Sequence, residues 1–200
     1  MKIFLPANKM LHAFAAAVAL SALGAATAHA HLPGDSVAGW AEGLAHPFTG
    51  LDHVLAMVAV GLWAAQMGRR AAWLLPLAFP TVMIAGTILA ALGVAVPGVE
   101  AGIAGSVMVL GLLVALAARP SVAVAAVVVG FFAFFYGQVH GTELVMAADP
   151  WIYGTGFVLA TALLHGTGLV FGSAAGRPLD RYAGAAVSAA GLVFFASLWM

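Results

Sequence analysis

Long apolar stretches separated by short polar ones dominate this chain. From residue 47 onward there are six apolar segments of about twenty residues, the length at which an α-helix crosses the hydrocarbon core of a bilayer. The connections between them are too short to hold a soluble domain. The pattern therefore predicts an all-α protein, a single bundle of six transmembrane helices within residues 31–200, with spans at approximately 47–66, 72–95, 100–118, 122–144, 151–173 and 182–199.

The first thirty residues follow a different pattern. Lys2 and Lys9 precede an apolar, alanine-rich run from Leu11 to Ala26, and Ala28-His29-Ala30 is a small-x-small sequence. A basic start, an apolar centre and such a cleavage site are typical of a secretory signal peptide. We expect cleavage after Ala30, so that the mature chain begins at His31 outside the cytoplasmic membrane. The alternative is an uncleaved first membrane helix.

The distribution of arginine predicts the orientation of the bundle. Positively charged loops stay on the cytoplasmic side of a membrane. Here the loops after the second and fourth spans contain no Lys or Arg, whereas the loops after the odd-numbered spans carry Arg69, Arg70, Arg119, Arg177 and Arg181. The odd loops are therefore expected in the cytoplasm, and both termini of the mature chain in the periplasm of a bacterium, with the protein in the inner membrane.

Composition supports the membrane class and excludes several functions. Hydrophobic residues make up 64% of the chain and charged residues 7%, against about a quarter charged in soluble domains. The net charge is zero and there is no basic run, which argues against a nucleic-acid partner. The absence of cysteine excludes disulfides, iron–sulfur clusters and thiolate zinc sites. No GxxxxGK[ST] loop is present, so the chain does not hydrolyse nucleotides by itself.

The most concentrated chemistry lies in the segment His46-Pro47-Phe48-Thr49-Gly50-Leu51-Asp52-His53. It places two imidazoles and a carboxylate at the start of the first span. His46 and His53 are seven residues apart and share a face if a helix begins near Pro47. Nitrogen and oxygen ligands without sulfur suit Ni²⁺, Co²⁺, Cu²⁺ or Zn²⁺. The alternative reading is an N-cap histidine followed by a buried histidine paired with its neighbour.

The predicted topology gathers further ligand-type residues at the same membrane face. Glu100 opens the third span there, while His140 and Glu143 close the fourth span, three residues apart on one helical face. An acidic group at depth costs about 2.5–3.5 kcal/mol on insertion scales, so several together indicate function. We predict one outward-facing metal site, built from His46, Asp52, His53, Glu100, His140 and Glu143. Carboxylate–histidine pairs that only tie helices together are the alternative.

Two further histidines are candidate ligands along the path of an ion. His165 lies about 21 Å down the fifth span from Trp151, whereas His53 lies only about 9 Å below Pro47. His165 is therefore expected to be a second station on an inward path, or else a core histidine bonded to a backbone carbonyl. After cleavage, His31 would pair its imidazole with a free α-amine and chelate an ion at the entrance. The alternative for His31 is a residue merely tolerated after the cleavage site.

Several motifs resemble one known family. HPFTGLDHVLAMVAVGLWA and FFAFFYGQVHGTE are similar to the two signatures of the HupE/UreJ family of nickel/cobalt permeases, and GVEAGIAGSV and ATALLHGTGL also look like that family. The resemblance covers the whole mature chain and implies metal uptake from the periplasm, which serves hydrogenase or urease maturation in relatives. One departure stands out, because family members often have His where this chain has Tyr136.

The sequence thus predicts a secondary permease rather than an enzyme, with Ni²⁺ or Co²⁺ as transported ligand and no permanently bound cofactor. Its expected partners are the ion and the lipid bilayer, with a homo-oligomer or a cytoplasmic metallochaperone as further candidates. Two other functions stay open. One is a b-type haem protein with His53 and His140 as axial ligands. The other is a membrane metallohydrolase with Glu143 as the base.

Overall fold

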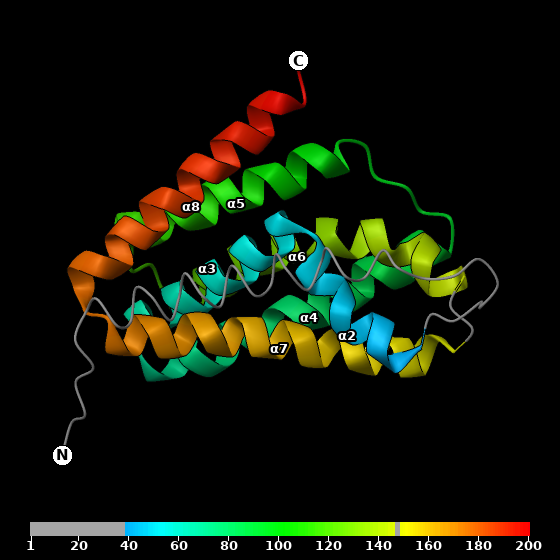
Figure 1. The fold of residues 1–200 in the computed structure, drawn as a ribbon, viewed down its shortest axis with the longest axis horizontal. Coiled ribbons are helices and arrows are strands. Elements are labelled where there is room, and N and C mark those ends of the chain that lie inside the picture. Colours follow the sequence, from blue (N-terminus) through cyan, green and yellow to red (C-terminus); the bar gives the residue numbers. More distant parts are fainter. Residues whose placement is uncertain (1–38, 147–148) are drawn as a thin grey trace.

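A computed structural model describes residues 39–146 and 149–200 of the chain, and the regular structure within them is entirely helical. Figure 1 shows the arrangement of the helices. They are α2 (Trp40–Thr49), α3 (Leu51–Met67), α4 (Arg69–Ala91), α5 (Val99–Ala115), α6 (Val122–Met146), α7 (Pro150–Ala174) and α8 (Arg177–Ser197). The predicted signal peptide and His31 lie outside the described residues.

Several of these helices have the length and composition of membrane spans. Among the described residues, α4, α7 and the part of α6 from Val122 to Gly141 are each long and apolar enough to cross a bilayer. The α2–α3 pair counts as a fourth if the two bent helices form one span, and α5 is apolar but only 17 residues long. The all-helical membrane class is confirmed, and the count of six spans stays a prediction.

The outer surface of the helices is apolar, as a lipid environment requires. The side chains of Trp73, Val127 and Val170 are 77%, 71% and 69% exposed, although each belongs to a residue type that a soluble protein would bury. They lie on α4, α6 and α7, the three helices that qualify as spans. We infer that these side chains face the hydrocarbon core, because exposed apolar surface on this scale is tolerated only against another apolar phase.

The helices pack in pairs that are distant in sequence. α4 lies against α6, α5 against α8, and α3 against α7 (Figure 1). In the α3–α7 pair, a Cβ added at Gly61 would lie 2.1 Å from the His165 carbonyl oxygen, so only glycine permits this approach of the backbones. Val58 of α3 lies beside Gly168 of α7, and further along the chain Ala65 of α3 lies beside Gly172 of α7, so the residue numbers of the contacts increase along both helices. The two helices therefore run in the same direction, as spans one and five must.

The first predicted span differs from expectation. The helix does not begin near Pro47: α2 begins at Trp40, includes Pro47 and ends at Thr49, and α3 then leaves at 85° after Gly50. Gly50 has extended backbone angles (φ −102°, ψ 119°), which interrupt the helical hydrogen bonds. The prediction that His46 and His53 share one helical face is therefore wrong. The bend, not helical periodicity, places them near each other.

Candidate metal centre

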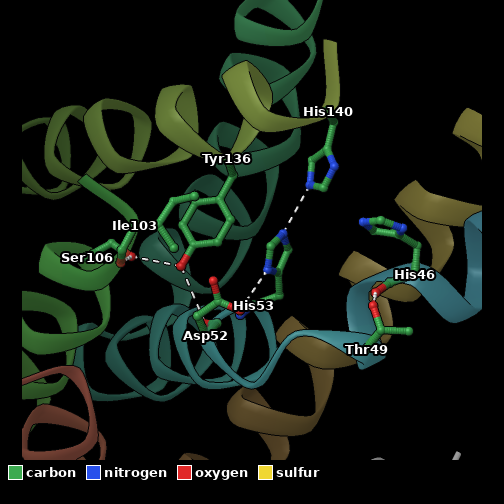
Figure 2. A network of polar contacts seen from close by, with 8 residues as sticks. All are labelled: His46, Thr49, Asp52, His53, Ile103, Ser106, Tyr136 and His140. Carbon is green, nitrogen blue, oxygen red and sulfur yellow. Dashed lines mark hydrogen bonds and ion pairs between the residues drawn. The ribbon is translucent and has the colours of Figure 1, made fainter. Parts of the chain in front are cut away.

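Three histidines from three helices meet at the bend between α2 and α3. His46 comes from the last turn of α2, His53 from the first turn of α3, and His140 from α6. The ring centroids of His46 and His140 are 4.8 Å apart, those of His53 and His140 5.2 Å, and those of His46 and His53 6.3 Å. Figure 2 shows His53 directed toward His140, with His46 beside them. The structure brings these three predicted site residues together, and their binding of a metal ion stays a prediction.

Asp52 fixes the orientation of the His53 ring. His53 Nδ1 lies 3.0 Å from Asp52 Oδ1, and the backbone N–H of His53 donates to the same oxygen at 2.9 Å (Figure 2). An ionised carboxylate only accepts hydrogen bonds, so Nδ1 carries the proton and Nε2 of the neutral ring has its lone pair available. A carboxylate that holds the far nitrogen of an imidazole is the arrangement found behind many metal-ligating histidines.

The available nitrogen of His53 points at His140. The two Nε2 atoms are 3.0 Å apart, a hydrogen bond in which His140 donates if His53 keeps its Nδ1 proton. Two imidazole nitrogens bound to one ion by bonds of about 2.1 Å at roughly a right angle would also be about 3.0 Å apart. The separation therefore suits two neighbouring ligands of a single ion, once the His140 proton is on Nδ1 and the two rings have turned so that both Nε2 lone pairs face the ion.

The arrangement is not a closed metal site as it stands. Among the described side chains, which exclude those of residues 142–148 and 177, no three His, Asp or Glu are grouped so that they could already hold an ion. The Glu143 side chain lies outside the described part, although its backbone continues α6 one turn beyond the helix position of His140. The histidines therefore need a ring rotation and a change of the His140 tautomer, with its proton on Nδ1, before they can ligate together.

Glu100 lies apart from the histidine rings. It lines a pocket of about 260 Å³ between the ends of α3, α5 and α8, and Asp52 lines the same pocket. None of the histidine cluster, which consists of His46, His53 and His140, lines this pocket. The structure thus joins Glu100 to the site only through Asp52, which faces the pocket and also holds His53.

His165 occupies a separate position deeper in the bundle. Its side chain is 1% exposed, and its ring packs against Phe79 with centroids 5.2 Å apart. Along α7 it follows Phe157, whose ring contacts both His46 and His140, by two turns, or about 12 Å. That spacing fits the difference in depth expected between His53 and His165, and the role of His165 stays a prediction.

Comparison with known proteins places the chain among relatives. Residues 14–194 match the family described as HupE / UreJ protein. The chain belongs to the HupE/UreJ family. It is also 49% identical to the protein HupE of Rhizobium leguminosarum bv. viciae over 169 residues, which cover 82% of this chain and 87% of that relative. No solved structure matches the chain.

Tyr136, at the position where the resemblance leads us to expect histidine in relatives, lies beside the His53 ring. Its hydroxyl lies 2.8 Å from Ser106 Oγ, and Ser106 Oγ in turn lies 2.6 Å from the Ile103 carbonyl oxygen. Because Ser106 donates its one hydrogen to Ile103, Tyr136 donates to Ser106, and its 3.4 Å contact with the Asp52 carbonyl is the weaker branch (Figure 2). Tyr136 therefore supports the backbone and the His53 ring edge, 4.8 Å away between centroids.

Sequence reasoning missed the aromatic side of the site. Tyr153 and Phe157 of α7 pack against His46 with ring centroids 6.1 Å and 5.7 Å away, and Phe157 also contacts His140 at 4.8 Å. The sequence contains a pattern that could have shown this, because Tyr153, Phe157, Thr161 and His165 follow one another at intervals of four residues and so lie on one face of α7. The apolar content of the whole span concealed this stripe.

Proposed function

We propose that this protein is a secondary permease for Ni²⁺, with Co²⁺ as the other candidate cargo, and not an enzyme. In this proposal the ion moves from the periplasm across the bacterial inner membrane and supplies the maturation of a hydrogenase or urease. Membership of the HupE/UreJ family supports this function. The observation that carries it is the 3.0 Å contact between His53 Nε2 and His140 Nε2 at the Asp52-supported bend.

The proposed capture step follows from the hydrogen bonds. Asp52 keeps the proton of His53 on Nδ1, so Nε2 can bind an arriving ion without a change of tautomer. His140 changes to the tautomer with its proton on Nδ1, by exchange with water, which makes the Nε2 lone pair available to the ion, and His46 completes a set of three imidazoles. Glu143, one turn beyond His140, is the proposed carboxylate ligand. A set of nitrogen and oxygen donors selects borderline divalent cations over Mg²⁺ and Ca²⁺, which prefer oxygen alone.

The pocket shared by Asp52 and Glu100 is the proposed entrance. Two carboxylates beside an apolar surface attract divalent cations and raise their local concentration. An ion held there is next to Asp52 and therefore next to His53. In this proposal Glu100 gathers ions without belonging to the final set of ligands.

The geometry weighs against the haem alternative. An iron between two axial imidazoles would hold their nitrogens about two metal–nitrogen bonds apart, about 4 Å, on opposite faces of a macrocycle. His53 and His140 instead touch at 3.0 Å, and Asp52 gives no advantage to a haem beyond orienting one ring. The metallohydrolase alternative requires a cleft for a substrate beside the histidines, and no observation in the described residues favours such a cleft.

Nickel uptake by cells under nickel limitation tests the proposal. Wild type should accumulate nickel, whereas Asp52→Ala should abolish uptake because His53 loses the group that sets its tautomer. Asp149→Ala is the matched control, since the Asp149 carboxylate caps α7 by accepting from the Trp151 and Ile152 N–H groups. Uptake by Asp52→Ala at the control level, with equal amounts of protein in the membrane, would contradict the proposed function.

A further inference from the structure

Polar atoms without a hydrogen-bond partner lie in the interior of the bundle below the histidine cluster. Thr161 Oγ1 and both ring nitrogens of His165 are buried and unpartnered among the described residues, with Thr161 0% and His165 1% exposed. The backbone contact of the His165 ring to Thr161 does not meet hydrogen-bond geometry. A buried polar group left unpaired costs about 1–3 kcal/mol, so a native protein rarely keeps several together without a use.

Thr161 differs from the comparable threonines. A helical threonine normally donates its hydroxyl proton to a carbonyl three or four residues earlier. The other threonines of α4 and α7 do so: Thr81 donates to Leu77, Thr87 to Met83, Thr155 to Ile152 and Thr167 to Leu163. Thr161 is more deeply buried than these and makes no such bond. Its oxygen is therefore available to a ligand.

Thr161 and His165 continue a stripe that begins at the histidine cluster. Phe157, Thr161 and His165 are four residues apart and lie on one face of α7. The Phe157 ring contacts His46 and His140. Thr161 is one turn, about 6 Å, further along the helix, and His165 is about another 6 Å beyond it. The unpartnered atoms thus lie next on the way inward from the cluster.

A series of aromatic ring contacts leads from His53 to His165. Tyr136 packs against His53, Phe79 packs against Tyr136 at 5.5 Å, and His165 packs against Phe79 at 5.2 Å. Tyr136 is anchored by its bond to Ser106, whereas the Phe79 ring has no polar group to hold it.

The helix that carries Phe79 is weakened on both sides of that residue. Pro76 and Pro80 lie inside α4, and each lacks the N–H that would bond four residues back. Phe79 is therefore the ring in this chain of contacts that can turn most readily.

We propose that Thr161 and His165 form an inner binding site for a divalent cation, and that the Phe79 ring is the barrier between this site and the histidine cluster. The identity of the cargo rests on the proposed function. One imidazole, one hydroxyl and bound water hold an ion more weakly than three imidazoles and a carboxylate. A weak inner site allows the ion to leave, which a transporter requires at each step.

Thiol labelling tests both parts of the proposal. The chain contains no cysteine, so His165→Cys introduces a single reactive thiol behind Phe79. In spheroplasts, a charged, membrane-impermeant thiol reagent added outside should label His165→Cys slowly. Adding Phe79→Ala should speed labelling at least about tenfold. Leu75→Ala is the matched control, because Leu75 is also 0% exposed and lies one turn earlier on the same face of α4, and it should leave the rate nearly unchanged.

Nickel chloride supplies the second measurement. In the Phe79→Ala, His165→Cys variant the introduced thiolate takes the place of the His165 imidazole as a nickel ligand beside Thr161, so Ni²⁺ should slow labelling by occupying the inner site, and adding Thr161→Val should weaken that protection. Equal acceleration by Phe79→Ala and Leu75→Ala would overturn the barrier, and labelling indifferent to nickel would overturn the inner site. Phe79→Leu replaces Phe79→Ala if the latter does not accumulate in the membrane.

The readouts separate this proposal from the proposed function. Neither labelling nor protection requires net transport. Normal nickel uptake by wild type without protection at the inner site overturns only the inner site, whereas protection without uptake supports the inner site and contradicts the permease.

Discussion

At the scale of single residues, the site depends on which nitrogen of His53 carries the proton. Asp52 Oδ1 accepts from both the backbone and the ring of His53, at 2.9 Å and 3.0 Å. This arrangement makes Asp52 a supporting group for His53, a role different from the direct ligand that the motif alone suggests. The distinction has a measurable consequence.

Asp52→Asn should lower nickel affinity about 10–100-fold, the usual loss when the carboxylate behind a ligating histidine is removed. The amide has nearly the same shape but no charge, and it can present an N–H to the ring and favour the wrong tautomer. Equilibrium dialysis of purified protein with nickel measures the effect, with Asp149→Asn as a control that keeps the helix cap. An affinity within twofold of the control would show that Asp52 does not orient His53.

Which residues meet could be predicted from the sequence only in part. Topology placed His46, His53 and His140 at one membrane face, because spans and loops are readable from apolar runs. The contact of His53 with His140, 87 positions apart, depends on the rotation of α3 and α6 about their axes. Small residues set that rotation through packing, and no local pattern reports it. Tyr153 and Phe157 were missed for a different reason, because the apolar content of α7 concealed their four-residue spacing.

At the scale of elements, the bend at Gly50 creates the site. A glycine within an apolar run is compatible with a continuous helix, so the sequence pattern alone does not reveal the break. The structure explains why glycine is needed: a Cβ at this position would lie 2.6 Å from Asp52 Oδ1 and 2.8 Å from His53 Nδ1. The side-chain pair folds back over the bend and occupies the space that any other residue would fill.

Gly50→Ala should therefore separate Asp52 from His53 and reduce nickel affinity at least about tenfold, since it disturbs the same support as Asp52→Asn. The backbone angles at Gly50 suit alanine, so the protein should still fold. Gly166→Ala is the control, because a Cβ there meets nothing within 4 Å. Isothermal titration of purified Gly50→Ala and Gly166→Ala with nickel measures the affinities. Equal affinities of the two variants would mean that nickel binding does not need the Asp52–His53 contact.

Asp180, in the first turn of α8 and outside the predicted 182–199 span, should make stability depend on pH. Its side chain is 2% exposed, Oδ1 has no hydrogen-bond partner, and burial raises the pKa of its carboxyl from 3.8 to about 6. The protonated form therefore favours the folded state, and this stabilisation is lost as pH rises from about 4 through about 6.

Asp180→Asn mimics the neutral carboxyl and should raise the melting temperature at pH 7.5 by roughly 2–4 °C, after allowance for solvent screening. At pH 4.5 the gain should largely disappear, because the wild-type carboxyl is then protonated in the folded protein. Thermal unfolding in detergent at both pH values provides the measurement. A variant less stable than wild type at pH 7.5 would show that the charged carboxylate has a stabilising partner.

At the scale of the whole molecule, composition was enough to predict an all-helical membrane protein, and the motifs were enough to suggest its family. The number of spans was harder to predict. The bent α2–α3 pair and the 17-residue α5 do not conform to the rule of one straight twenty-residue helix for each span. Both irregular elements border the candidate site, since Asp52 lies in the first turn of α3 and Glu100 in the first turn of α5. The helices are therefore bent or shorter than a regular membrane span at the end of the bundle where the polar candidate ligands lie.

Nickel binding by purified wild type, His53→Ala, His140→Ala and the double variant tests the central claim, that the two imidazoles hold one ion, most directly. Residues that share one ligand are coupled, so the loss in the double variant should be clearly smaller than the two single losses combined. Losses in binding free energy that simply add would place the two histidines at independent sites. Unchanged affinity in both single variants would remove the histidine cluster from nickel binding altogether.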